Sequence, residues 1–227
     1  MDTIVKIIPC EVDKEQLFQK LHIKPDSRFV EKLDEMIEQA LEVGKPKIAY
    51  KLSYVDEKGD DFVVVEGIKF TSRVLRVNLE DTFKVVPFVV TCGRELEEWA
   101  GKFTDTLDMF FADGIMEAVL RAARNRVFPE IDEEFGLGHS SNMNPGSLKD
   151  WPIKEQKPLF RLLGDVQALI GVELKDSFLM SPIKSVSGFR FPKEGSFESC
   201  QLCPRKDCPG RKAPYDKNLY EEKYRKK

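Results

Sequence analysis

Apolar residues at helical spacing mark the region from 27 to 44. Phe29, Leu33, Met36 and Ala40 recur every three or four positions, so they fall on one face of a helix. Gly44 follows the last of them and is a typical helix end. We expect a short strand at 4–8 and a helical turn at 17–21 before this helix. The pattern thus predicts an amphipathic helix with one face on a core.

Runs rich in β-branched and aromatic residues predict strands in the next section. IAYKLSYV (48–55) and DFVVVEGIKF (61–70) flank the turn-forming DEKGD, an arrangement typical of a β-hairpin. FKVVPFVVTC (83–92) predicts a mostly buried strand, and its Pro87 favours an edge position or a bulge.

The rest of the chain alternates helices and strands. A helical region follows Gly93, breaks near Gly101 and continues over 104–126 with apolar residues on one side. WPIKEQKPLFRLLG (151–164) predicts another helix, and residues 168–191 predict two strands around a Ser-Pro turn. We therefore expect an α+β fold, with a largely antiparallel twisted sheet and long helices. Residues 1–195 form a single domain in this reading, and 196–227 form a Cys-rich basic tail.

Composition narrows the class of protein. The 227 residues are 41% hydrophobic and 33% charged, with a net charge of −3. This balance is typical of a soluble globular protein and gives no basic field to recruit nucleic acid. The N-terminal stretch lacks a long apolar segment, so we expect no signal peptide, no membrane span and a cytoplasmic location.

The sequence lacks the residues that several classes of enzyme need. With only His22 and His139, a His-rich metal site is excluded, and no Gly-x-Ser-x-Gly elbow accompanies either histidine. A phosphate-binding Gly-Lys loop and a dinucleotide fingerprint are absent as well.

Three cysteines in the tail form the most specific local pattern. Cys200, Cys203 and Cys208 follow a C-x2-C-x4-C spacing among basic residues. Close thiols of this kind bind zinc or an iron–sulfur cluster, with a fourth ligand from Cys10, Cys92, another group or a partner. Redox or thiol exchange and simple reduced thiols in a surface turn are the alternatives.

Four segments, taken in order, resemble one family. They are TCGRELEEW, LDMFFADGIMEAVLRAARNRV, NPGSLKDWPIKEQKPLFRLL and DSFLMSPIKSVSGFRF, within residues 80–191. They resemble the reactivation domain of cobalamin-dependent methionine synthase and, more closely, its short stand-alone relatives. The resemblance implies a fold that binds S-adenosylmethionine and docks on a corrinoid protein. There, an electron from a flavodoxin-like donor and a methyl group from S-adenosylmethionine restore methylcobalamin from cob(II)alamin.

The family pattern carries over unevenly to the candidate site. Glu117, which interrupts an apolar helical pattern and needs a partner or a site, takes the place of a family carboxylate that contacts the ligand. Ser187 and Gly188 lie in an intact S-V-S-G segment that supports the site. In the loop SNMNPGSLKDW, Pro145 and Gly146 allow close backbone approach to a ligand. The family arginine and tyrosine are replaced there by Asn142 and Ser147.

Three functions are compatible with these residues. The first is a stand-alone reactivation protein in the methyltransferase system of methionine biosynthesis, acting on a separate methionine synthase that carries cobalamin. The second is a non-catalytic module that binds a corrinoid protein and has lost S-adenosylmethionine binding. The third is a metal- or cluster-bearing reductive activator of corrinoid proteins.

Overall fold

The fold is built around β6 (Lys84–Thr91), which has buried residues at all but its first position. The computed structural model describes residues 2–193, 197–208 and 211–225. β6 pairs along one edge with β10 (Ser185–Pro192) and along the other with β2 (Lys47–Tyr50) and β3 (Ser53–Lys58), always antiparallel. The eight-stranded sheet continues from these through β1 (Ile4–Ile7), β4 (Phe62–Val65), β5 (Ile68–Thr71) and β7 (Ser140–Met143), and β8 (Glu173–Leu174) pairs separately with β9 (Met180–Ser181).

The expected α+β class with an antiparallel sheet is confirmed, but the edge position of Pro87 is wrong. β6 is central, and Pro87 lies between the stretch that pairs with β3 and the stretch that pairs with β2. The carbonyl of Pro87 accepts a hydrogen bond from the amide of Lys51, in the link between those two strands, at 3.3 Å. The N–H and C=O of one antiparallel residue point to the same edge, so the missing N–H falls where the partner strand changes.

The predicted hairpin exists, but each of its two runs forms two strands. The first run divides into β2 and β3, and the second into β4 and β5. The break between β4 and β5 is a turn at Glu66 and Gly67, whose φ angles are 48° and 75°. A positive φ at two successive positions is the signature of a tight hairpin turn, which the Glu-Gly pair provides.

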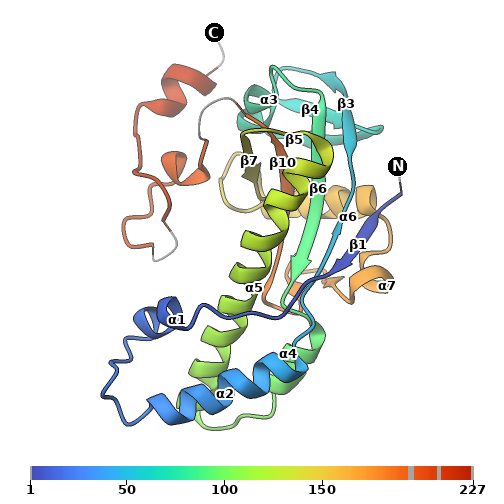
Figure 1. The fold of residues 1–227 in the computed structure, drawn as a ribbon. Helices are drawn as coiled ribbons and strands as arrows, with labels where there is room; N and C mark the ends of the chain where they lie inside the picture. The colour runs from blue at the N-terminus through green and yellow to red at the C-terminus, as the bar shows by residue number, and fades with distance from the viewer. Residues whose placement is uncertain (1, 194–196, 209–210, 226–227) are drawn as a thin grey trace.

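Helices cover both faces of the sheet (Figure 1). Between the helices and the sheet lie two hydrophobic clusters. The first cluster joins one sheet face to α1, α2, α4 and α5, and the second joins the other face to α3, α6 and α7. The bounds are α1 (Lys14–Lys20), α2 (Val30–Val43), α3 (Arg73–Asn78), α4 (Arg94–Ala100), α5 (Thr106–Phe135), η1 (Ile153–Glu155), α6 (Gln156–Leu163), α7 (Val166–Ile170), η2 (Ser199–Leu202) and the π turn η3 (Tyr220–Tyr224).

The long helix α5 extends further than the sequence pattern predicts. It continues past Arg126 to Phe135 and ends at Gly136, which takes the left-handed conformation at φ 58°. Pro129 lies inside it but faces solvent, while Phe128 and Ile131 beside it are buried. Packing of this last part on the sheet therefore outweighs the loss of one backbone hydrogen bond at the proline.

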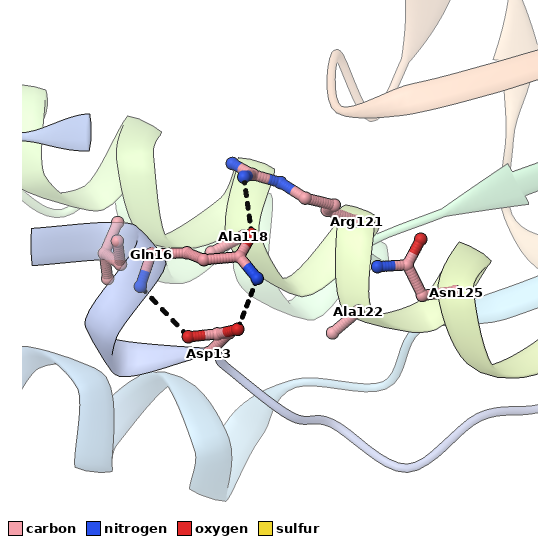
Figure 2. A pocket seen from close by; sticks show the side chains of 7 residues that line it. Asp13, Gln16, Ala118, Arg121, Ala122 and Asn125 are labelled. Atoms are coloured by element: carbon pink, nitrogen blue, oxygen red, sulfur yellow. Dashed lines mark hydrogen bonds between the residues drawn. The ribbon is translucent and has the colours of Figure 1, made fainter. Parts of the chain in front are cut away.

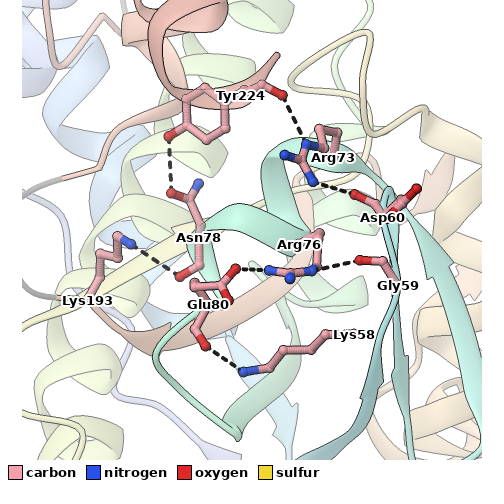
Figure 3. Close-up of polar contacts among 9 residues, drawn as sticks. All are labelled: Lys58, Gly59, Asp60, Arg73, Arg76, Asn78, Glu80, Lys193 and Tyr224. Carbon is pink, nitrogen blue, oxygen red and sulfur yellow. Dashed lines mark hydrogen bonds and ion pairs between the residues drawn. The ribbon is translucent and has the colours of Figure 1, made fainter. Parts of the chain in front are cut away.

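The C-terminal tail is anchored in the second cluster by Tyr224. This side chain is fully buried, and its hydroxyl donates to Oδ1 of the buried Asn78 at 3.1 Å. Arg73 donates from Nε to the carbonyl of Tyr224 at 3.0 Å, so α3 holds the tail by both residues (Figure 3). The tail therefore contributes a core residue, although most of its side chains are exposed or partly exposed.

Within the described residues, no helix is both long enough and apolar enough to cross a membrane.

Candidate functional site

The candidate site is an unpaired stretch on the edge of β10. One edge of this strand pairs with β6 from Ser185 to Arg190, and the other pairs with β7 only from Phe189 onward. The second edge of residues 185–188 therefore pairs with no strand in the part of the chain that the structure describes. We call this stretch the open edge. Four extended residues span about 13 Å, the length of an extended small molecule.

The loop between β7 and η1 closes one end of the open edge. Asn144 donates from Nδ2 to the carbonyl of Ser187 at 2.7 Å. The Gly146 amide donates to the carbonyl of Trp151 at 2.8 Å, and the Ser147 amide donates to the carbonyl of Asn144 at 3.1 Å. Because the Trp151 side chain is fully buried, this loop is a fixed turn rather than a spacer.

Gly188 is where the loop meets the strand most closely. A Cβ atom there would lie 2.4 Å from the carbonyl oxygen of Met143 and 2.6 Å from Nδ2 of Asn144. A larger residue would push these groups away, so the approach of the two segments requires glycine. Ser187 is buried, and its hydroxyl donates to Oε1 of Gln156 on α6 at 3.3 Å. Gly188 thus lets the loop approach β10, and Ser187 ties the strand to α6; that the two residues support a ligand site stays a prediction.

Asp150 fixes the same loop to α3, a link that the sequence reasoning missed. Its carboxylate accepts hydrogen bonds from the amides of Arg73 at 3.2 Å and Val74 at 2.9 Å, and from the hydroxyl of Ser72. Ser72 also caps α3 by accepting from the amide of Leu75. The Ser72 cap is readable as a local signal, but the partner 78 residues away is not.

Glu117 lies at the opposite end of the open edge. Lys184, which directly precedes β10, places its Nζ 3.8 Å from Oε2 of Glu117 and 2.9 Å from Oδ1 of Asp113. Lys20 of α1 forms an ion pair with Glu117, and Arg121 approaches it at 3.9 Å. The side chain of Glu117 is 43% exposed. Its carboxylate is thus partly exposed, and its need for a partner is met by three cations.

A small cavity lies beside this ion cluster, between α1 and α5. The side-chain oxygen of Gln16 accepts a hydrogen bond from Arg121 at 3.2 Å. The backbone amide and the side-chain amide of Gln16 both donate to the carboxylate of Asp13 (Figure 2). The cavity measures about 40 Å³, which is room for a few water molecules at most. The hydrogen bond to Gln16 holds Arg121 near Glu117, and the cavity itself is too small for a nucleoside.

Asn142 occupies the third position of β7 and faces α5 rather than the loop. Its Oδ1 accepts from Nη1 of Arg190 at 2.9 Å. Arg190 also binds Asp132 of α5 through Nε at 2.6 Å and Nη2 at 2.5 Å, and it lies 4.6 Å from the ring centre of Phe128. Asn142 and Arg190 thus belong to a clamp between strand and helix.

The cysteines of the tail do not form a metal-binding group in the described residues. Cys200, Cys203 and Cys208 are free thiols that are partly exposed. No set of three or more Cys, His, Asp or Glu side chains within the described ranges is close enough to hold a metal ion.

Comparison with known proteins gives a fold and no sequence family. No family model matches the chain, and no curated protein matches its sequence. A crystal structure of the MetH reactivation domain bound to AdoHcy matches with a TM-score of 0.59 and 16% sequence identity. The match covers 88% of this chain and 81% of that chain. The chain therefore has the fold of the reactivation domain, as the sequence resemblance predicts.

Proposed function

We propose that this chain is a stand-alone reactivation protein. It supports reductive remethylation of cob(II)alamin on a separate cobalamin-dependent methionine synthase or related corrinoid protein. S-adenosylmethionine is the methyl donor, and a flavodoxin-like protein supplies the electron. The observation that carries the proposal is the fold match over 88% of the chain to a domain bound to AdoHcy. The open edge adds support, because it is flanked by the loop and the carboxylate that the family resemblance points to.

The open edge offers the groups that such a ligand needs. Backbone N–H and C=O groups of an unpaired strand edge bind polar atoms in fixed directions. The amides of Gly146 and Ser147 are engaged within the turn, so the loop contributes the close approach that Gly146, with a φ of 88°, allows a ligand. Glu117 supplies a carboxylate of opposite sign to a sulfonium group. The bound ligand supplies the methyl group, and the protein holds it and excludes water.

Two side-chain anchors of the family are missing, which predicts weak binding. The amide oxygen of Asn142 is taken by Arg190, whose own charge is paired with Asp132. Asn142 carries no charge, and the guanidinium of Arg190 is already paired. No cation at this position is therefore free for the carboxylate of the ligand. Loss of a hydrogen bond to a charged group costs about 1.5–3 kcal/mol, roughly a tenfold to hundredfold drop in affinity.

A second candidate function is favoured by the cations around Glu117. Lys20, Lys184 and Arg121 surround this carboxylate, with Asp113 as the further acid in the group. These cations repel a sulfonium unless one of them moves away. An alternative role is a module that binds a corrinoid protein without S-adenosylmethionine.

Isothermal titration with S-adenosylmethionine and with S-adenosylhomocysteine tests the proposal. The second ligand lacks the positive sulfur, so Glu117→Gln should weaken the first ligand more than the second. Asn144→Ala should weaken both, because its amide holds the loop on Ser187. Glu130→Gln is the matched control, since Glu130 lies on α5, is 49% exposed and pairs with Lys6 and Arg126.

The outcomes separate the two functions. Binding that responds to Glu117→Gln and not to Glu130→Gln supports the reactivation role. No heat with either ligand up to about millimolar concentration, where the binding free energy is only about 4 kcal/mol, supports the second role instead.

A further inference from the structure

Cys200 and Cys203 are placed by a 3₁₀ turn at the spacing of a disulfide. The amide of Cys203 donates to the carbonyl of Cys200 at 3.2 Å, which closes η2 around the pair. In a 3₁₀ helix, side chains three residues apart lie directly above one another, and three residues rise about 6 Å. Disulfides join Cα atoms about 4.4–6.8 Å apart, so this turn brings the two Cα atoms within the range that a disulfide spans.

Arg211 holds the backbone on both sides of this pair. Its guanidinium donates to the carbonyls of Cys200 at 3.1 Å, Cys203 at 3.3 Å and Ala213 at 3.2 Å, and also to the carbonyl of Arg205. The turn is thus fixed before any covalent bond forms. A guanidinium at this position also opposes a metal cation among the same cysteines.

The environment distinguishes Cys200 from the other thiols. Its Sγ accepts a hydrogen bond from the amide of Lys212 at 3.4 Å, so a donor is in place for negative charge on this sulfur during exchange. Both Cys200 and Cys203 are partly exposed. Burial raises the pKa of Cys92 to about 12 and that of Cys10 to about 11, so these two stay protonated at neutral pH.

We propose that Cys200 and Cys203 form a dithiol–disulfide site that exchanges with a small-molecule disulfide such as oxidised glutathione. The Cys200 sulfur attacks one sulfur of the small disulfide and releases one thiol. Cys203 then attacks the Cys200 sulfur of the mixed disulfide and releases the second thiol. The two protein thiols are oxidised, the small disulfide is reduced, and both protons leave on the released thiols. This inference does not depend on the proposed function.

The test equilibrates the reduced full-length protein with a series of glutathione redox buffers. Free thiols are then blocked, and peptides are mapped by mass spectrometry. We expect one internal disulfide, mapped to Cys200 and Cys203, that is reversed by excess reduced glutathione. Cys203→Ser should retain glutathione on Cys200, because the resolving thiol is missing. Cys208→Ser is the matched control in the same tail and should behave like the unaltered protein.

Other outcomes overturn the proposal. A disulfide that includes Cys208, or glutathione adducts without any internal disulfide, would show that η2 does not pair these thiols. Stoichiometric zinc or iron in protein purified without oxygen, lost in Cys208→Ser, would assign the three cysteines to a metal instead.

Discussion

Arg190 on β10 and Asn142 on β7 face each other across the sheet, with Nη1 donating to Oδ1 at 2.9 Å. The resemblance places an arginine at the Asn142 position. Here the guanidinium comes from the neighbouring strand, and Asp132 neutralises it through two hydrogen bonds. The charge therefore joins β10 to α5, and it is not available to a ligand carboxylate.

Removal of one member of this clamp should destabilise the fold strongly. Arg190→Met leaves the poorly solvated carboxylate of Asp132 with the hydroxyl of Ser140 but without its cation, so we expect a loss of about 3 kcal/mol in the free energy of unfolding. Asn142→Ala removes one neutral acceptor and should cost about 1 kcal/mol. Urea denaturation measures both. The double variant Arg190→Met/Asp132→Asn should lose less than the two single changes summed, and additive losses would contradict a direct ion pair.

Asp150 should control the order of the candidate loop. Asp150→Ala removes the acceptor for the amides of Arg73 and Val74, so the stability should fall by about 1–2 kcal/mol. We also expect faster hydrogen exchange at the amides of Gly146 and Ser147, because the loop loses its tie to α3. Asp165→Ala, which removes the cap of α7, is the control. If both variants change loop exchange equally, Asp150 has no specific role there.

Gly188→Ala should separate the loop from β10. The added Cβ would meet the backbone oxygen of Met143 at 2.4 Å, so we expect destabilisation of about 1–3 kcal/mol. Gly101→Ala is the control, since its Cβ would meet its nearest neighbour at 3.4 Å and its φ is −65°. Thermal denaturation of the two variants gives the comparison, and equal melting temperatures would contradict the close approach at Gly188.

Tyr224 should anchor the tail through its ring and its hydroxyl separately. Tyr224→Ala empties a fully buried site and should cost about 3–5 kcal/mol. Tyr224→Phe keeps the ring but leaves Oδ1 of Asn78 without its donor, so a loss of about 1–2 kcal/mol is expected. Tyr215→Ala, at a side chain that is 47% exposed, should change the stability little. Urea denaturation of the three variants under one set of conditions measures whether the losses in stability follow this order.

The buried thiol of Cys92 should make the protein less stable in alkaline solution. Burial raises its pKa from 9.0 to about 12, so the folded state keeps a proton that the unfolded state loses. The unfolded state binds fewer protons above pH 9, so stability is full below this value and falls as the pH rises. The free energy of unfolding of the unaltered protein should therefore exceed that of Cys92→Ala by about 1.4 kcal/mol less at about pH 10 than at about pH 8. Urea denaturation at the two pH values measures it, and a constant gap would contradict the shift.

The spacing of apolar residues was enough to predict helices and strands whose pattern is set by neighbouring residues in the chain. The amphipathic helix before Gly44 and the buried strand around Val89 follow directly from residue spacing, and both are observed as α2 and β6. The position of Pro87 in the sheet was not predictable, because it depends on the point along β6 where the pairing partner changes from β3 to β2. A single sequence carries no signal for such a change of partner.

The candidate site was predicted in part. Glu117 was singled out because a carboxylate interrupts an apolar helical pattern, but its cations come from α1 and from the approach to β10. Asp150 and Arg190 have partners 78 and 58 residues away, so residue spacing could not identify their roles. Their geometry is set by strand register and by the end of α3.

The order of pairing around β6 also constrains how the chain is made. β10 pairs with residues 86–91 along one edge of β6 and begins 94 residues after the last residue of that strand, from Thr91 to Ser185. During translation, the edge of β6 that pairs with β10 therefore stays unpaired until residues 185–192 have left the ribosome. Such long-range pairing folds slowly and leaves a strand edge open to association with other nascent chains. A sheet that is completed by its last long strand therefore keeps an unpaired strand edge until late in synthesis.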